Sequence, residues 1–251
     1  MFPYRDENPS ILSPAVTVGI IVLNVLAWVF VQGAGFDELA MANSVCNLGL
    51  VPGELLGTVP PGTSVPLSRE LACVVDPEPS YATLVTSMFM HGGWFHLIGN
   101  MMFLWVFGNN IEDAMGHGRF MAFYLICGLA AAGAQMLVDP NSAIPMVGAS
   151  GAISGVLGGY LLLYPRVRVH TFIFLGFFMT SVALPAYILL GYWALLQFLG
   201  GLPALLGAAA GGGVAFWAHL GGFGAGLVLI RLFVRPENLQ RRPVQVMHWR
   251  R

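Results

Sequence analysis

Long apolar stretches without a charged residue alternate with short polar segments along the 251-residue chain. A helix needs about 20 such residues to cross the hydrocarbon of a bilayer. The last stretch, between Arg168 and Arg231, is too long for one helix and is interrupted by Pro185 and several glycines, so it holds two spans. The pattern predicts an all-α, polytopic membrane protein with six transmembrane helices, at about residues 15–32, 94–111, 120–138, 148–164, 186–199 and 214–233. Residues 171–184 are ambiguous, because they either extend the fifth helix or lie partly at the interface.

The composition supports a membrane location. Charged residues make up 9% of the chain and apolar residues 57%, whereas soluble domains carry roughly a quarter of charged residues. So few charges would leave large apolar patches exposed on a soluble enzyme, and disordered chains are poor in apolar residues. Both of these classes are therefore excluded.

The arginines indicate how the spans are oriented. All 11 basic residues are arginine, and with a cytoplasmic N-terminus only Arg69 lies outside, as the positive-inside rule requires. We predict a multi-pass protein of the cell inner membrane, with a cytoplasmic segment 1–13, a six-span domain 14–234 that includes a long external loop 33–90, and a cytoplasmic arginine-rich tail 235–251. The alternative, a cleaved signal peptide, would leave five spans and break this asymmetry. A net charge of −1 gives no indication of nucleic-acid binding.

Two of the three cysteines lie in the predicted external loop. The predicted external location of Cys46 and Cys73 is a compartment that permits thiol oxidation, so a disulfide between them is possible. The alternative is two free thiols. Cys127 falls within the third span and is interpreted as a small packing residue.

Four polar residues mark the outer ends of three predicted spans: His96, Asn100, Ser150 and His219. An unpaired polar side chain is costly in hydrocarbon, so such residues are functional candidates. All three helices run inward, which places the four groups at one depth. A serine needs a base to become a nucleophile, and histidine is the usual one. No acidic residue shares the layer, so a Ser-His dyad is the simplest hypothesis.

Other interpretations of these residues remain open. Ser150 lies on a stripe of small residues with Gly151, Gly155 and Gly159, where a serine often serves only helix contact. His96 and His219 could be packing residues. They could also bind a metal ion, although the sequence offers no third strong ligand at the same depth.

Three motifs in this order resemble the rhomboid family of intramembrane serine proteases. They are the run from Thr86 to Met101 with His91-Gly92-Gly93-Trp94-Phe95-His96 and Asn100, the motif Gly148-Ala149-Ser150-Gly151, and the motif Ala218-His219-Leu220-Gly221-Gly222. The resemblance covers residues 14–233 and agrees with six spans and an inside N-terminus.

The resemblance implies a catalytic mechanism. Ser150 would be the nucleophile, His219 the general base, and His96 and Asn100, with the Ser150 backbone N–H, the oxyanion hole. Substrates would be single-span or otherwise membrane-anchored proteins within membrane lipid, and no cofactor or metal is implied. Because hydrolysis needs water, we expect residues 211–213, with residues 198–206, to act as a mobile lid.

The resemblance also implies some structural roles. Gly222 and Gly226 would pack the sixth helix against the fourth, and Glu112 and Arg119 match a structural acidic and basic pair. Many members carry an aromatic residue where this chain has Ser154, so we expect other neighbours, such as Trp217 or Phe216, to orient His219 instead.

Two other classes of function agree less well with the sequence. An inactive rhomboid-like protein that binds membrane clients typically lacks the serine or the histidine, and this chain has both. A small-solute transporter would show internal duplication and charged residues at the midplane, and the sequence has neither.

Overall fold

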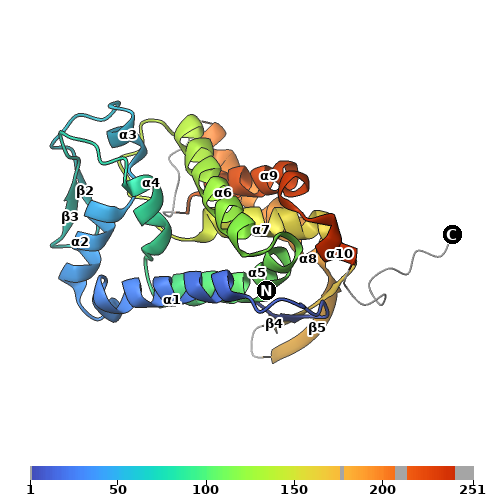
Figure 1. Cartoon of the computed structure of the whole chain (residues 1–251). Coiled ribbons are helices and arrows are strands. Elements are labelled where there is room, and N and C mark those ends of the chain that lie inside the picture. The colour runs from blue at the N-terminus through green and yellow to red at the C-terminus, as the bar shows by residue number, and fades with distance from the viewer. Residues whose placement is uncertain (1, 176–177, 207–213, 241–251) are drawn as a thin grey trace.

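The computed structural model describes residues 2–175, 178–206 and 214–240, and six of its helices occupy the six predicted spans (Figure 1). These helices are α1 (Ala15–Phe30), α5 (Trp94–Met115), α6 (His117–Val138), α7 (Ser150–Leu163), α8 (Ala186–Leu205) and α9 (Phe216–Phe233). Among the described helices, α6, α8 and α9 are long and apolar enough to cross a membrane, and α1 and α7 are shorter apolar helices. The predicted polytopic helical fold is confirmed.

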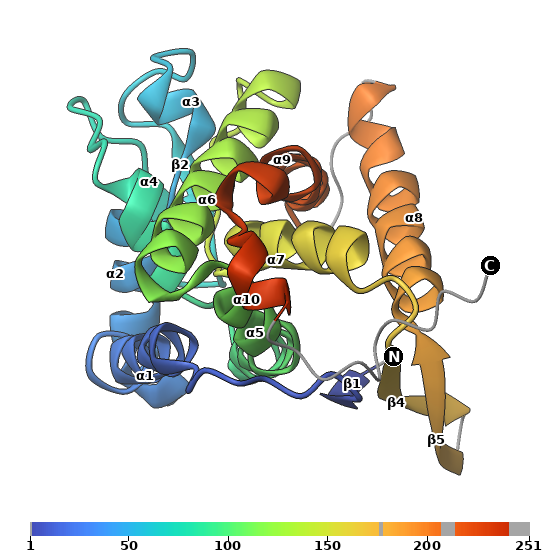
Figure 2. The ribbon, with the colours of Figure 1, turned by 45° about the vertical axis from the view of Figure 1, so that its right-hand side comes forward.

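Helix α7 is the central element, packed against α5, α6, α8 and α9 (Figure 2). Its contact with α9 is made by backbone atoms, because glycines face each other. A Cβ atom on Gly222 would overlap the carbonyl oxygen of Gly151, and one on Gly226 would overlap that of Gly155. The expectation that these two glycines pack α9 against α7 is therefore confirmed, and small residues are what allow this approach.

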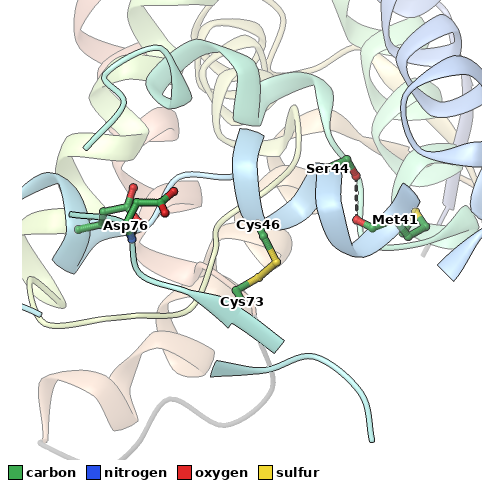
Figure 3. Close-up of a disulfide and its surroundings, with 6 residues drawn as sticks. Met41, Ser44, Cys46, Cys73 and Asp76 are labelled. Carbon is green, nitrogen blue, oxygen red and sulfur yellow. Dashed lines mark hydrogen bonds between the residues drawn. A yellow bond between two sulfur atoms is a disulfide. The ribbon is translucent and has the colours of Figure 1, made fainter. Parts of the chain in front are cut away.

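The segment 33–90 folds as a compact unit at one end of the bundle, called the loop end here (Figure 1). A disulfide between Cys46 and Cys73 joins α2 to β3 (Figure 3), which decides between the two alternatives left by the sequence. Cys127 is buried and free, next to Gly155, as a packing residue would be. The unit contains α2 (Glu38–Leu48), α3 (Pro52–Leu55), α4 (Thr83–Thr86), β2 (Ser64–Pro66), β3 (Ala72–Val74) and the short 3-10 helices η1 (Gly33–Gly35) and η2 (Ser87–Phe89).

The buried side chain of Gln32 ties the end of α1 to the beginning of α5. Its Oε1 accepts a hydrogen bond from the His91 backbone N–H, and its Nε2 donates to the His91 carbonyl oxygen, both at 2.8 Å. Nε2 also lies 3.2 Å from Ser44 Oγ in α2. One amide thus joins three segments just before the polar residues of α5.

The opposite end, called the sheet end, carries three antiparallel strands in the order β1-β4-β5: β1 (Phe2–Asp6), β4 (Arg168–Leu175) and β5 (Phe178–Pro185). Within the ambiguous segment 171–184, the described residues 171–175 and 178–184 are thus strand and do not extend a helix. Their β-branched and aromatic residues favour a pleated, half-buried strand, and the N-terminal segment completes the sheet. This sheet was not predicted.

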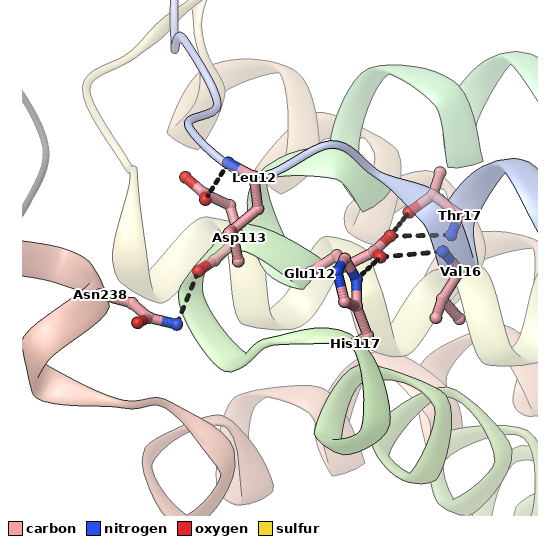
Figure 4. A network of polar contacts seen from close by, with 7 residues as sticks. All are labelled: Leu12, Val16, Thr17, Glu112, Asp113, His117 and Asn238. Carbon is pink, nitrogen blue, oxygen red and sulfur yellow. Dashed lines mark hydrogen bonds and ion pairs between the residues drawn. The ribbon is translucent and has the colours of Figure 1, made fainter.

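Glu112 of α5 secures the start of α1, and the neighbouring Asp113 accepts a hydrogen bond from the Leu12 backbone N–H at 2.9 Å (Figure 4). The fully buried Glu112 accepts hydrogen bonds from the backbone N–H groups of Val16 and Thr17 at 2.8 Å, and from Thr17 Oγ1 at 2.7 Å. Pro14 at the N-cap provides no side-chain hydrogen bond to the helix. Glu112 therefore accepts from backbone N–H groups of the first turn that have no partner within the helix. Its other partner is His117, whereas Arg119 donates to the carbonyl oxygen of Phe233.

Parts of two predictions lie outside the described residues. They are residues 211–213 of the proposed lid and residues 241–251 of the predicted tail; residues 198–205 belong to α8. The beginning of the tail forms α10 (Pro236–Gln240), and Asn238 there donates to the carbonyl oxygen of Asp113 at 3.1 Å (Figure 4).

Candidate active site

The structure brings His96, Asn100, Ser150 and His219 together around one cavity of about 540 Å³. Each lies within the first two turns of its helix: α5 for His96 and Asn100, α7 for Ser150 and α9 for His219. The volume is typical of a ligand pocket. The beginnings of three helices thus border one cavity.

Ser150 and His219 form a direct hydrogen bond. His219 Nε2 lies 2.7 Å from Ser150 Oγ. Ser150 is the first residue of α7, so its backbone N–H has no carbonyl partner within the helix. The turn before it depends on Gly148, whose φ of +124° is rarely adopted by other residues and whose N–H donates to the Ser87 carbonyl oxygen at 2.8 Å.

The second ring nitrogen of His219 is also paired. Nδ1 lies 2.8 Å from Oε1 of Gln197 on α8. The Trp193 ring, one turn earlier on α8, lies with its centroid 6.1 Å from that of His219. Helix α8 thus supplies two neighbours of the imidazole.

The expectation that Trp217 or Phe216 orients His219 is wrong. Trp217 Nε1 donates to the carbonyl oxygen of Gly201 at 2.9 Å, and Phe216 packs against Gly200. Both side chains therefore point to the C-terminal part of α8. The hydroxyl of Ser154 is bonded to the helix backbone, since its Oγ donates to the Ser150 carbonyl oxygen at 2.6 Å.

Gln197 is the residue that the sequence analysis missed. It is the only amide in the predicted fifth span, and the rule that selected His96 and Asn100 applies equally to it. The signal was therefore present in the sequence. The hydrogen-bond partner of Gln197 could not be predicted, since nothing in the sequence shows which side of α8 faces α9.

His96 and Asn100 direct nitrogen atoms to the turn that precedes Ser150. A Cβ atom on Gly148 would lie 2.6 Å from His96 Nε2 and 3.4 Å from Asn100 Nδ2. The Gly92 N–H points to His96 Nδ1 at 3.3 Å, so a neutral His96 carries its proton on Nε2. Both nitrogens can then donate into the cavity.

Asn100 Nδ2 is buried and has no hydrogen-bond partner among the described residues. A buried donor without a partner is expensive. It borders the cavity beside Ser150, where a developing negative charge could accept its hydrogen bond. Asn100 Nδ2 is therefore placed to donate a hydrogen bond when a reaction creates an acceptor in the cavity.

The electrostatic surroundings are neutral. His91 packs edge-to-face on His96, with ring centroids 5.1 Å apart, and its burial and the proximity of His96 lower the pKa of His91 to about 3. The described residues that line the cavity include no Asp or Glu. The site therefore offers an uncharged hydroxyl–imidazole pair with uncharged donors.

The chain is similar to known rhomboid proteins. Residues 78–236 match the family described as "Rhomboid domain". The chain is 35% identical over 103 residues to "RHOMBOID-like protein 5" of Arabidopsis thaliana, covering 40% of this chain and 33% of the relative. It is 40% identical over 78 residues to "Rhomboid protease GluP" of Bacillus subtilis, covering 31% of this chain and 15% of the relative. The matches thus span about a third or less of these relatives.

Proposed function

The chain belongs to the rhomboid family, and from this premise we propose that it is an intramembrane serine endopeptidase that cleaves membrane-anchored proteins. The observation that carries the proposal is the 2.7 Å contact between Ser150 Oγ and His219 Nε2 at the edge of the cavity. A hydroxyl in hydrogen-bond contact with an imidazole is an activated nucleophile.

In the proposed reaction Ser150 Oγ attacks the carbonyl carbon of the scissile peptide bond, and His219 Nε2 takes its proton. The resulting oxyanion accepts hydrogen bonds from His96 Nε2, Asn100 Nδ2 and the Ser150 backbone N–H. When the C–N bond breaks, His219 gives the proton to the leaving amine. Water then attacks the acyl-enzyme carbonyl carbon, with His219 as base. The bond to Ser150 Oγ breaks, His219 returns the proton to Oγ, and the carboxylic acid is released. Every proton moves between side chains, substrate and water, so the proposal includes no cofactor.

We further propose that the sheet end faces the cytoplasm of a bacterial-type cell and that the protein resides in its inner membrane. Arginine is concentrated near the sheet end and in the tail, in agreement with the positive-inside rule. The disulfide lies at the loop end, and disulfides persist on the oxidising side of a membrane. Segments 1–13 and 235–251 are then cytoplasmic, and the membrane domain 14–234 exposes loop 33–90 outside.

The proposal is tested with the purified full chain in detergent and a single-span test substrate. We expect a discrete cleavage product and covalent labelling of Ser150 by a fluorophosphonate, located by mass spectrometry. Ser154, one turn later on the same helix, is the internal control and should stay unlabelled, because its hydroxyl is bonded to the helix backbone. A protein that retains the substrate uncleaved, with Ser150 unlabelled, would instead be a proteolytically inactive client-binding rhomboid.

The oxyanion donors give a graded prediction. His96→Ala and Asn100→Ala should each lower kcat by about 10²-fold and leave KM nearly unchanged, because the donors act on charge that exists only in the transition state. The measurement is steady-state cleavage of the same substrate. Met101→Leu is the control, since Met101 borders a separate apolar groove on the α1 side of α5. Equal kcat for wild type and both alanine variants would remove these residues from the oxyanion hole.

A further inference from the structure

We infer that Gln197 of α8 is a positioning residue that holds His219 in the tautomer and orientation required to accept the Ser150 proton. The inference rests on the proposed protease function. It adds a third side chain to the pair, contributed by a third helix.

The amide orientation of Gln197 follows from its two contacts. Its Nε2 donates to the carbonyl oxygen of Trp193 at 3.5 Å, one turn earlier on α8. Because the NH₂ group is used there, Oε1 faces His219 Nδ1, at 2.8 Å. An amide oxygen can only accept, so Nδ1 carries the ring proton.

This assignment leaves the lone pair of His219 Nε2 directed at Ser150. With the proton on Nδ1, Nε2 is unprotonated and accepts from Ser150 Oγ at 2.7 Å. The opposite tautomer would place an N–H against the hydroxyl and could not take its proton. In serine proteases with a triad, a buried aspartate selects this tautomer. Here the neutral amide of Gln197 selects it without placing a charge in the membrane.

Other described groups around His219 do not perform this task. Ser154 Oγ is bonded to the Ser150 carbonyl oxygen, and Trp193 presents its ring, with an interplanar angle of 38° to the imidazole. The cavity has no Asp or Glu among its described lining residues. The orientation of His219 therefore depends on α8, through one hydrogen bond and one ring contact.

Two substitutions of Gln197 separate its acceptor from its bulk. Gln197→Leu removes the acceptor and keeps a side chain of similar size. Gln197→Glu keeps an oxygen acceptor at the same position. Leu195→Met is the matched control on α8, because Leu195 is exposed to the surroundings of the bundle. Gln197 is only half-buried, so neither change opens a void in the core.

We expect Gln197→Leu to lower kcat by about 10- to 100-fold, the range typical of losing a hydrogen bond that orients a functional histidine, with KM within about twofold of wild type. Gln197→Glu should restore most of that loss, and Leu195→Met should match wild type. The rate of fluorophosphonate labelling at Ser150 should follow the same order, since it reports activation of the serine without a protein substrate.

A spectroscopic measurement examines the tautomer directly. Protein labelled with ¹⁵N-histidine gives distinct shifts for protonated and unprotonated ring nitrogens, and the His219 signals are assigned by their loss in His219→Ala. Wild type and Gln197→Glu should show the Nδ1–H form, and Gln197→Leu should show a substantial Nε2–H population.

Two results would overturn the inference: wild-type kcat and tautomer in Gln197→Leu, or equal impairment of the Leu and Glu variants. Failure of the inference differs from failure of the proposed function. If wild type neither cleaves nor labels, the protease function itself is wrong. If wild type and Gln197→Leu cleave equally well, only the role of Gln197 is wrong.

Discussion

Replacing Ser150 or His219 by alanine should lower the rate of substrate cleavage by at least about 10⁴-fold, to the background of the assay. The proposed reaction needs the Ser150 hydroxyl to form the acyl-enzyme and the His219 imidazole to move its proton, and the two are joined by one hydrogen bond. Because they act as a unit, the double variant should be no slower than either single variant. Product formation over time with the single-span substrate measures this.

Retained folding must be demonstrated for both variants. Ser150 and His219 border the cavity and are partly accessible, so neither alanine empties a tightly packed core position. Thermal midpoints close to wild type are therefore expected. The control variant is Ser154→Ala, which removes a hydroxyl from the same helix and should stay active. Substantial cleavage by Ser150→Ala would contradict the nucleophile assignment, whatever the behaviour of His219→Ala.

The second large effect is expected from a single methyl group between α7 and α9. Gly222→Ala would place Cβ onto the carbonyl oxygen of Gly151, a backbone atom that cannot turn aside. The helices must separate, and His219 lies three residues before Gly222 on α9. A shift of about 1 Å at the reacting groups can lower activity by about 10²-fold, and overpacking typically destabilises by about 1–3 kcal/mol.

Gly224→Ala is the matched control, because it adds the same methyl group to the same helix. No atom lies within 4 Å of the position its Cβ would occupy. It should therefore keep wild-type cleavage and thermal stability, while Gly222→Ala loses both. Activity is measured with the test substrate and stability by thermal unfolding in the same detergent. Equal behaviour of the two variants would show that close α7–α9 packing is not what places His219 beside Ser150.

The helices and the candidate residues were largely predictable from the sequence for a physical reason. A bilayer requires uncharged apolar segments of a set length, so the six helices are visible as gaps between charges. A polar side chain inside such a gap costs free energy unless it is paired, so it indicates a functional role. This cost is what made His96, Asn100, Ser150 and His219 candidates. The structure places these four around one cavity.

The elements that were missed depend on contacts between distant parts of the chain. Residues 171–175 and 178–184 form strands because β4 pairs with β5 and with β1, about 165 residues earlier in the sequence. The disulfide of Cys46 was one of two open alternatives until the fold set α2 beside β3. Glu112 was expected to be structural, but its partners are the first turn of α1 and His117, and not Arg119.

The sequence by itself determined the polytopic helical fold, the approximate limits of its apolar helices and the polar residues at their ends, because these follow from local polarity and the cost of burying polar groups. Only the tertiary structure decided which groups meet. Glycines at the α7–α9 contact bring Ser150 and His219 together, and the rotation of α8 turns Gln197 toward His219 Nδ1. Helix rotation and close approach depend on packing against every neighbour at once, so no single segment carries that information.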